Sequence, residues 1–136
     1  MIGKLLFTSL LPAGAWAISS VFMADAEDVR RIALSLPRTT EGHVRDYVKY
    51  RIGRIVYASV SPDGTRLGFG FPKEERAALV ASEPGKFMMP IRSDERYNWV
   101  RAQLAALDVD ELSELLTDAW CMCVPKKVSN AYLNGE

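Results

Sequence analysis

The chain has 136 residues, 49% of them hydrophobic, and its 17 basic and 17 acidic residues give a formal net charge of zero. A chain of this size removes roughly two-thirds of its unfolded surface from water, which allows one hydrophobic core and one domain. Zero net charge excludes a whole-molecule field that attracts polyanions or membranes, so any nucleic-acid role has to come from a local patch.

Residues 1–22 form an apolar stretch with a single charged residue. Together with the A-x-A-like site Ala15-Trp16-Ala17, this pattern is typical of a signal peptide. However, Pro12 and Gly14 interrupt the apolar run, and Met23 has the form of a natural start immediately before the first helical pattern.

We therefore interpret residues 1–22 as an apolar extension upstream of the natural start, and we expect the domain itself to span residues 23–136. A signal or anchor is one alternative, and an additional structural element is another. Membrane contact is expected only if the extension is an anchor. Otherwise we expect a cytoplasmic protein whose thermal stability does not change when the extension is deleted.

The first predicted element of the domain is a helix from Asp25 to Leu36. Its apolar residues recur at helical spacing, and acidic residues occupy the first turn, at the positive end of the helix dipole. These apolar residues are Val29, Ile32, Ala33 and Leu36. Pro37 ends the helix, and turn-forming residues predict a loop over residues 37–42.

The period of the pattern then changes to two, which predicts a strand from Val44 to Ile52 with one apolar and one basic, aromatic face. The apolar face comprises Val44, Val48, Tyr50 and Ile52. The opposite face comprises Arg45, Tyr47, Lys49 and Arg51. Gly53 turns the chain into a second strand, residues 54–61, which is rich in β-branched residues.

The segment Ser61-Pro62-Asp63-Gly64 predicts a hairpin, because Pro presets the turn and Gly takes the left-handed position. Apolar residues then alternate with Arg66 and two glycines up to Phe71. This third strand completes a three-stranded meander.

A second helix is predicted from Pro72 to about Ser82, followed by strands over Phe87–Ile91 and Tyr97–Leu104 with the polar loop Arg92–Arg96 between them. Asp108 and Asp110 are expected to cap a long last helix. Its continuous apolar stripe comprises Leu112, Leu115, Leu116, Ala119, Trp120 and Cys123. The tail, residues 129–136, is expected to fray.

The predicted element order is therefore α-β-β-β-α-β-β-α. Hairpins with helices set apart favour an α+β fold with two layers, in which helices cover one face of an antiparallel sheet. No internal repeat or interdomain linker interrupts the pattern.

Six short segments, in this order and spacing, resemble the MmcQ/YjbR family of small bacterial proteins, and the resemblance runs from about residue 28 to residue 128. The segments are Ser35-Leu36-Pro37, Thr40-Glu41-Gly42, Tyr50-Arg51-Ile52-Gly53-Arg54, Arg96-Tyr97-Asn98-Trp99-Val100-Arg101, Asp118-Ala119-Trp120 and Pro125-Lys126-Lys127. The resemblance implies a compact α+β domain and, by the family's common label, DNA binding. It implies no reaction. The same arrangement of elements also resembles secretion-chaperone-like folds, which bind protein segments.

The residues favour neither an enzyme nor a cofactor protein. His43 is the single histidine, and no nucleophile motif surrounds it. Cys121 and Cys123 are two apart within a predicted helix, so their side chains point away from each other and are not expected to form a disulfide. Zinc would need two further ligands that the sequence does not offer. We expect no catalytic residue, no metal site and no cofactor.

A basic patch is the main positive signal for function. From Arg38 to Arg66 there are six basic and three acidic residues, whereas the segment from Asp108 to Asp118 holds five acidic residues and no basic one. The molecule is therefore expected to be electrically lopsided. The candidate nucleic-acid-binding residues are Arg45, Tyr47, Lys49, Arg51, Arg54, Arg66, Trp99, Arg101, Lys126 and Lys127.

In this hypothesis the cations neutralise phosphates while Tyr47 stacks on bases, so DNA binding is expected to be weak and salt-sensitive. Trp99 joins Arg101 on the open face if Val100 points inward, and is a core residue if it points inward itself. Two alternatives remain: a basic face that is simply solvated, and a protein-interaction module without a nucleic-acid role.

Overall fold

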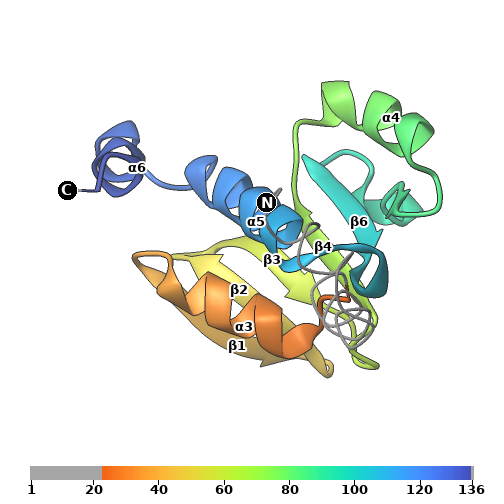
Figure 1. The fold of residues 1–136 in the computed structure, drawn as a ribbon, viewed down its shortest axis with the longest axis horizontal. Coiled ribbons are helices and arrows are strands. Elements are labelled where there is room, and N and C mark those ends of the chain that lie inside the picture. The colour runs from red at the N-terminus through yellow and green to blue at the C-terminus, as the bar shows by residue number, and fades with distance from the viewer. Residues whose placement is uncertain (1–22, 136) are drawn as a thin grey trace, which may run out of the picture.

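The computed structural model describes residues 23–135, which fold into one six-stranded antiparallel sheet with helices packed on it (Figure 1). The spatial order of the strands is β1-β2-β3-β4-β6-β5. The strands are β1 (Thr39–Val44), β2 (Tyr47–Ile52), β3 (Ile55–Val60), β4 (Arg66–Gly70), β5 (Phe87–Met88) and β6 (Trp99–Gln103). The helices are α3 (Ala26–Ser35), α4 (Lys73–Ser82), α5 (Val109–Cys121) and α6 (Lys126–Leu133), with short 3₁₀ turns η1 (Arg92–Asp94) and η2 (Leu104–Ala106).

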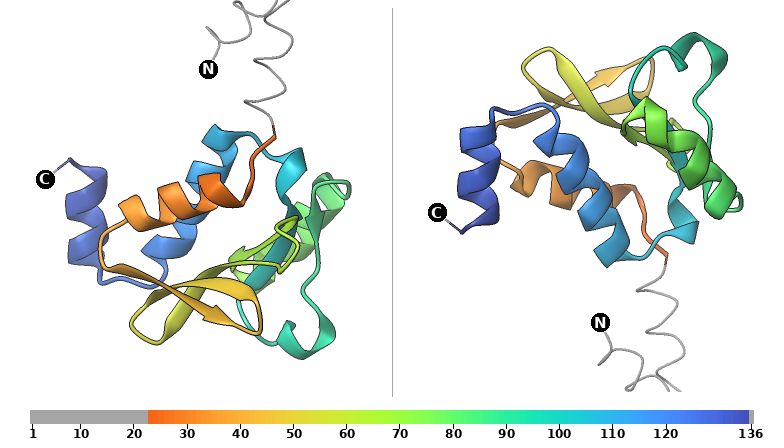
Figure 2. Two further views of the ribbon diagram at one scale, coloured as in Figure 1. Left: turned by 90° about the horizontal axis from the view of Figure 1, so that it is seen from below. Right: turned by 90° about the horizontal axis from the view of Figure 1, so that it is seen from above.

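The predicted fold class is confirmed, and the structure adds one strand and one helix to the predicted order. Helices α3 and α5 lie on one side of the sheet, while the segment that carries η1 lies on the other (Figure 2, left). Helix α4 packs against β5 and β6 (Figure 1). We call the face under α3 and α5 the inner face and the opposite one the outer face.

Helix α3 forms as the sequence predicts. The Asp25 carboxylate accepts a hydrogen bond from the backbone N–H of Asp28, whose carboxylate accepts one from the backbone N–H of Asp25. This capping box satisfies two backbone donors that the helix start leaves free. The four predicted apolar residues, Val29, Ile32, Ala33 and Leu36, are all buried.

The predicted loop is confirmed only at residues 37–38, and the prediction of a single strand from Val44 to Ile52 is wrong because a turn divides it. Residues 39–44 form β1, which pairs with β2 through a two-residue turn at Arg45 and Asp46. Both turn residues have positive φ, 51° and 70°, as the hairpin turns that suit the strand twist require. Arg-Asp lacks the glycine that normally announces such a turn, and the alternating pattern hides it.

This hairpin also corrects the position of Val44 and Arg45. Val44 pairs directly with Tyr47, so the two side chains share the outer face, and Val44 is exposed instead of packing with Tyr50. Arg45 belongs to the turn and not to the strand face of Lys49. The remaining predicted inner residues of β2 do contribute to the core. Tyr50 is buried, and Val48 and Ile52 pack against the core cluster.

The turn at Ser61–Gly64 is confirmed. Gly64 has φ +75°, and its N–H donates to the carbonyl of Ser61 at 2.9 Å. The Asp63 carboxylate accepts hydrogen bonds from the Ser61 hydroxyl and from both the N–H and the hydroxyl of Thr65, which lower its pKa to about 2.

A bulge in β3 shapes the sheet. Tyr50 pairs with Ala58 whereas Arg51 pairs with Val56, so Tyr57 is the extra residue. Tyr57 and Ala58 are consequently both buried, and the Tyr57 hydroxyl donates to the carbonyl of Ala33 at 3.3 Å. The Tyr57 hydroxyl oxygen also lies 2.8 Å from Thr39 Oγ1. The Tyr57 side chain therefore connects β3 to both β1 and α3.

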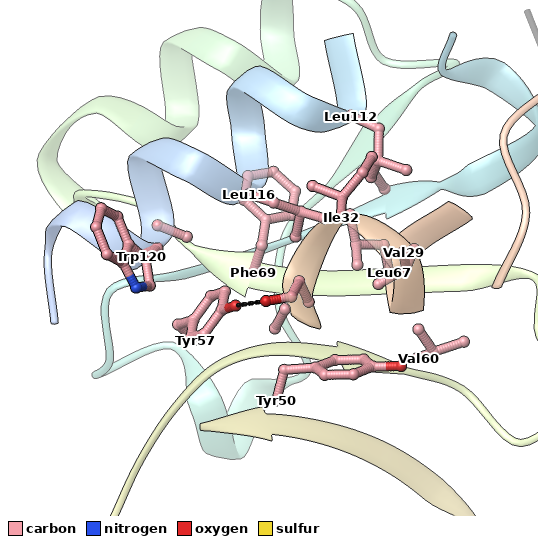
Figure 3. Close-up of a cluster of buried hydrophobic side chains, with 14 of the residues drawn as sticks. Val29, Ile32, Tyr50, Tyr57, Val60, Leu67, Phe69, Leu112, Leu116 and Trp120 are labelled. Atoms are coloured by element: carbon pink, nitrogen blue, oxygen red, sulfur yellow. Dashed lines mark hydrogen bonds between the residues drawn. The ribbon is translucent and has the colours of Figure 1, made fainter. Parts of the chain in front are cut away.

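The hydrophobic core lies between the inner face and helices α3 and α5 (Figure 3). Leu112, Leu116, Ala119 and Trp120 are the fully buried residues of α5. The Trp120 indole N–H donates to the carbonyl of Pro37 at 2.8 Å. The prediction that Trp120 belongs to the core is confirmed.

The predicted fraying of residues 129–136 is wrong for most of that segment. Helix α5 ends at Cys121, and α6 follows with Pro125 before its first turn. Helix α6 is held to the domain by the Tyr132 ring, which packs edge-on to Trp120 with ring centroids 5.1 Å apart, and Ser129 is buried.

Two predicted strands are shorter than expected. Strand β5 stops at Met88, two residues before Pro90, which lacks a backbone N–H for a ladder. Strand β6 starts at Trp99 because the preceding segment is bound to α4 instead. Over residues 23–135, no helix is both long and apolar enough to cross a membrane. The interpretation of residues 1–22 lies outside the described residues.

Candidate functional site

One row of paired residues crosses the outer face of the sheet. Lys49 on β2 pairs with Ser59 on β3, Ser59 pairs with Gly68 on β4, and Gly68 pairs with Arg101 on β6. The two cations of this row, Lys49 and Arg101, are separated by three strand spacings, about 14 Å between their Cα atoms. Because Ser59 and Gly68 are small, the middle of this row is a depression flanked by long basic side chains.

The depression belongs to a groove with a volume of about 870 Å³. The sheet supplies its floor. One wall carries Ile91, Asp94 and Tyr97 from the segment between β5 and β6, and the hairpin turns contribute Arg45 and Arg54. Met122 and Cys123, which follow the end of α5, also line the groove. The groove volume lies within the range typical of small-molecule sites.

Trp99 lies on the outer face of the sheet. The sequence pattern alone allowed either this position or one in the core. Its neighbours Val100 and Ala102 are fully buried on the inner face, while Trp99 is half-buried and lines the groove beside Arg101. The indole covers Gly68. Its Cζ2, Nε1 and Cε2 atoms lie 2.7, 2.8 and 2.9 Å from where a Cβ of residue 68 would be, so the ring meets Gly68 with this edge.

The charges that line the groove are mostly positive. The basic residues are Arg45, Lys49, Arg54, Arg66 and Arg101, and Asp94 is the one acidic residue among the described groove-lining residues. All five basic residues are among the sequence-predicted candidates. Their guanidinium and ammonium groups, brought to one concavity, create a local positive patch on a chain of zero net charge.

Lys49 is the one lysine among the described basic residues that line the groove. Its ammonium nitrogen lies 4.9 Å from the centroid of the Tyr47 ring. Partial burial lowers the pKa of Lys49, the negative charge of Asp94 acts in the opposite direction, and the positive charge of Arg51 adds to the lowering. Lys49 thus faces an aromatic ring and a carboxylate across the groove, a setting in which a further anionic partner is favourable.

Three predicted residues lie outside the groove. Arg51 shares the strand face of Lys49, but its side chain is half-buried and does not line the groove. Its Nε is buried without a hydrogen-bond partner in the described part of the chain. Lys126 and Lys127 are exposed in the first turn of α6 and do not extend the patch.

Arg76 positions the wall of the groove and was not among the residues predicted from the sequence. This residue of α4 is buried, and its guanidinium donates hydrogen bonds to the carbonyls of Glu95, Tyr97 and Trp99, the Tyr97 bond being 2.8 Å. Three alternate carbonyls of one segment, which leads through turns into β6, are thus bound to one side chain. A signal was present, since Arg76 lies three residues before Leu79 on the apolar side of the helix.

The first turn of α4 holds the same segment at further points. The Lys73 ammonium donates to the carbonyl of Arg96 at 3.2 Å, and the Lys73 backbone N–H donates to Asn98 Oδ1 at 3.0 Å. On the other side of Trp99, the Arg101 Nε donates to the carbonyl of Met89 at 3.0 Å. The wall is therefore attached to both α4 and β6.

Exposed apolar side chains surround the basic residues, a feature that the sequence analysis also missed. Six groove-lining residues are large, hydrophobic and each at least 42% exposed: Val44, Tyr47, Ile55, Ile91, Tyr97 and Met122. They come from four different parts of the chain, so no local pattern reveals them together. The groove thus combines positive charge with apolar and aromatic surface.

Other reactive side chains lie apart from one another. His43 is exposed on β1 and does not line the groove. Both cysteines are free, as predicted, and burial raises the pKa of the Cys123 thiol. Within residues 23–135, no group of three or more histidine, cysteine, aspartate or glutamate side chains is arranged to hold a metal ion.

Comparison with known protein families finds a match to the model described as YjbR, over residues 34–122. This region contains the whole sheet, α4 and the whole of α5. Lys126 and Lys127 fall beyond it.

Three mycobacterial proteins are similar to the chain over most of its length. One is from Mycobacterium bovis and two are from strains of Mycobacterium tuberculosis, and all three are described as uncharacterized. Each is 33% identical over 129 aligned residues, which cover 82% of this chain and 97% of the relative.

Among solved structures, the fold is similar to the crystal structure of a Deinococcus radiodurans protein with a DUF419 domain. The TM-score is 0.64, the sequence identity is 19%, and the match covers 76% of this chain and 80% of the other. At this identity the likeness establishes the shared fold.

Proposed function

The chain belongs to the YjbR family, and from this membership and the chemistry of the groove we propose that it is a nucleic-acid-binding domain without catalytic activity. Its ligand is DNA held in the groove on the outer face. Binding relies on phosphate contacts and base stacking, with little discrimination between sequences.

The convergence of seven of the ten predicted residues on one groove carries this proposal. Five cations and two aromatic rings from five separate segments line the same concavity, and Asp94 is the one acidic residue among the described residues that line it. Charge neutralisation of phosphates provides affinity, and aromatic side chains such as Tyr47 and Trp99 provide flat surfaces for bases.

The acidic helix α5 supports a defined orientation for the ligand. Its acidic residues follow the N-cap Asp108, whose carboxylate accepts a hydrogen bond from the backbone N–H of Glu111. Helix α5 covers the inner face (Figure 2), and Ala119 is the one residue of α5 that lines the basic groove. A polyanion is therefore attracted to the outer face and repelled from the helical one.

The proposal of a binding domain instead of an enzyme rests on what the groove presents. Its arginines are always charged and cannot act as general bases at neutral pH. The Cys123 thiol has a raised pKa, which disfavours the thiolate that a nucleophile requires. These groups suit recognition of an anion better than bond cleavage.

Fluorescence anisotropy of labelled DNA with the full 136-residue chain tests the proposal, at ~50 and ~200 mM salt. We expect binding with a Kd below about 10 µM at the lower salt and an affinity that falls at least ten-fold at the higher salt, because several phosphates release counterions. Absence of binding at the lower salt contradicts the proposal.

A protein-interaction role is the second candidate, and the six exposed apolar side chains in the groove favour it. Ile55, Ile91 and Met122 add surface that phosphates do not need, and apolar surface with Arg is typical of protein interfaces. Under this alternative the groove binds an extended segment with acidic and apolar side chains. A peptide of that composition that binds while DNA does not would favour the second candidate.

A further inference from the structure

We infer that the groove is built for unpaired nucleotides, with one base stacked against Trp99 between Lys49 and Arg101, and not for duplex DNA. This inference rests on the proposed nucleic-acid function and specifies the ligand. It draws on the depth at which Trp99 lies, on the residues at the rim and on the position of the cations.

The Trp99 ring lies deeper in the groove than the exposed side chains of the wall segment. Trp99 lies against Gly68 on the floor, while Tyr97 and Ile91 on the wall segment are more than half exposed. In a duplex, base faces are covered by neighbouring base pairs, so a ring in a recess meets no base unless one is extruded. In a single strand the base faces are accessible and stack readily on aromatic side chains.

The apolar side chains at the rim of the groove also favour single-stranded over duplex DNA. A duplex carries its phosphates and sugars on the outside and exposes base edges only within its grooves, so a duplex lying over this groove would bring Ile55, Ile91 and Met122 against a charged exterior. Burying charged oxygens against apolar groups is unfavourable. A single strand can turn its bases toward these side chains and its phosphates toward the arginines.

The cations are arranged along a path and not on a plane. Lys49 and Arg101 flank the floor, Arg66 lies on β4 one row from Arg101, and Arg45 and Arg54 lie at two hairpin turns. A row of charges on both sides of an aromatic floor is the arrangement that follows a flexible backbone.

The floor also offers a hydroxyl group. The hydroxyl of Ser59, the residue that pairs with Gly68, has no hydrogen-bond partner within residues 23–135. Ser59 lines the groove, so this hydroxyl is available to a base or a sugar. The floor therefore combines a stacking surface with a polar contact for one nucleotide.

A comparison of two DNA probes with equal numbers of phosphates tests the inference in the full chain. One probe is a labelled single strand of mixed sequence without self-complementarity, and the other is a hairpin duplex with a minimal loop. We expect the single strand to bind at least ten-fold more tightly at ~200 mM salt, where phosphate attraction is weakened. Equal or tighter duplex binding overturns the inference but leaves the proposed function intact, whereas binding of neither probe contradicts the proposed function itself.

The Trp99→Leu variant tests the stacking step while retaining an apolar side chain above Gly68. We expect single-strand affinity to fall by about ten-fold and duplex affinity to stay within about two-fold, since base stacking contributes only to the first complex. If single-strand affinity is unchanged, Trp99 is structural and the inference is wrong. If Trp99→Leu does not fold, Tyr47→Leu, at an exposed position beside the hairpin turn, replaces it with the same two readouts.

Discussion

The indole of Trp99 occupies the space that a side chain at residue 68 would need. Three of its ring atoms lie within 2.9 Å of the position where a Cβ atom of Gly68 would stand, a separation that real Cβ atoms do not tolerate. The floor of the groove thus depends on a glycine in the centre of a sheet, where glycine usually weakens a strand.

The first prediction concerns this contact. Gly68→Ala forces the Trp99 ring away from the floor, so we expect the free energy of unfolding to fall by about 1–3 kcal/mol, the usual effect of overpacking. We also expect DNA affinity to fall. Urea denaturation and anisotropy measure the two effects.

Gly42→Ala is the matched control, because Gly42 lies in the same row of the outer face, beside Lys49 on β1, with no atom within 4 Å of its would-be Cβ. Its stability should stay within about 0.5 kcal/mol of the parent or rise slightly. Equal effects of the two substitutions would show that the Trp99 contact is not what requires glycine at residue 68.

The second prediction locates the binding face. Replacing Lys49 and Arg101 together with glutamate reverses two charges at opposite sides of the groove floor, and we expect DNA affinity at ~50 mM salt to fall by more than ten-fold. Replacing Lys126 and Lys127 with glutamate makes the same change in net charge on α6, outside the groove, and should alter affinity by less than about three-fold. If the two double variants lose affinity equally, attraction is nonspecific and the groove is not the binding site.

The third prediction concerns Arg76, which positions the wall without lining the groove. In Arg76→Met the apolar stem remains, but the carbonyls of Glu95, Tyr97 and Trp99 lose their common donor. Hydrogen bonds from charged groups each contribute about 1.5–3 kcal/mol, so we expect a loss of at least about 2 kcal/mol in unfolding free energy.

Hydrogen exchange gives a second readout for Arg76→Met. Relative to the parent protein, the exchange of amides in residues 92–98 should accelerate more than that of amides in β2 and β3. Arg31→Met serves as control. Arg31 is exposed and pairs with Asp28 on α3, and loss of such a surface pair changes stability by less than about 1 kcal/mol. Uniform acceleration across the sheet would indicate global destabilisation instead of release of the wall.

The fourth prediction uses the β1–β2 turn. Asp46 has φ 70°, a conformation that glycine adopts without strain, so Asp46→Gly should raise the unfolding free energy by about 0.5–1 kcal/mol. Gly53→Ala in the next turn, at φ +60°, should lower it by about 1 kcal/mol for the opposite reason. Thermal denaturation measures both, and a destabilised Asp46→Gly variant would contradict the turn geometry.

The fifth prediction concerns alkaline pH. Burial raises the pKa of Tyr57 to about 12, whereas a tyrosine in the unfolded chain titrates near ~10. Between these values the unfolded state releases the phenolic proton while the folded state retains it. Stability should therefore fall as pH rises from about 10 to about 12.

The Tyr57→Phe variant tests the origin of this slope. Tyr50, whose pKa burial also raises, remains in both proteins and contributes equally to each. Phenylalanine removes the titrating group, so unfolding free energies measured by urea at several pH values above ~9.5 should decline less steeply in the variant. Identical slopes would mean that Tyr57 does not contribute to alkaline unfolding.

Much of the fold was predictable because its signals are local. The helical spacing from Val29 to Leu36 and the Pro-Asp-Gly turn before Thr65 each depend on a few neighbouring residues, and both formed as predicted. The failures also have local causes. The Arg45-Asp46 turn lacks glycine, and the sequence pattern does not distinguish a frayed tail from a helix held by a ring contact between Tyr132 and Trp120.

The candidate residues themselves were largely predictable, because a run of arginine and lysine with interspersed aromatic residues is visible in the sequence. Their grouping was not. Arg45 reached the groove through a turn and not through the predicted strand, and Arg51 was excluded from it although it shares the face of Lys49.

The sequence by itself determined the α+β class, most of the predicted inner-face residues and the basic character of one segment, because alternation and helical period act over short distances. Only the tertiary structure decided that Lys49, Gly68 and Arg101 lie in one row, that Trp99 covers the glycine and that Arg76 holds the wall. These relations depend on the register between strands that are distant in the chain, and register is set by the pairing of the whole sheet and not by any single segment.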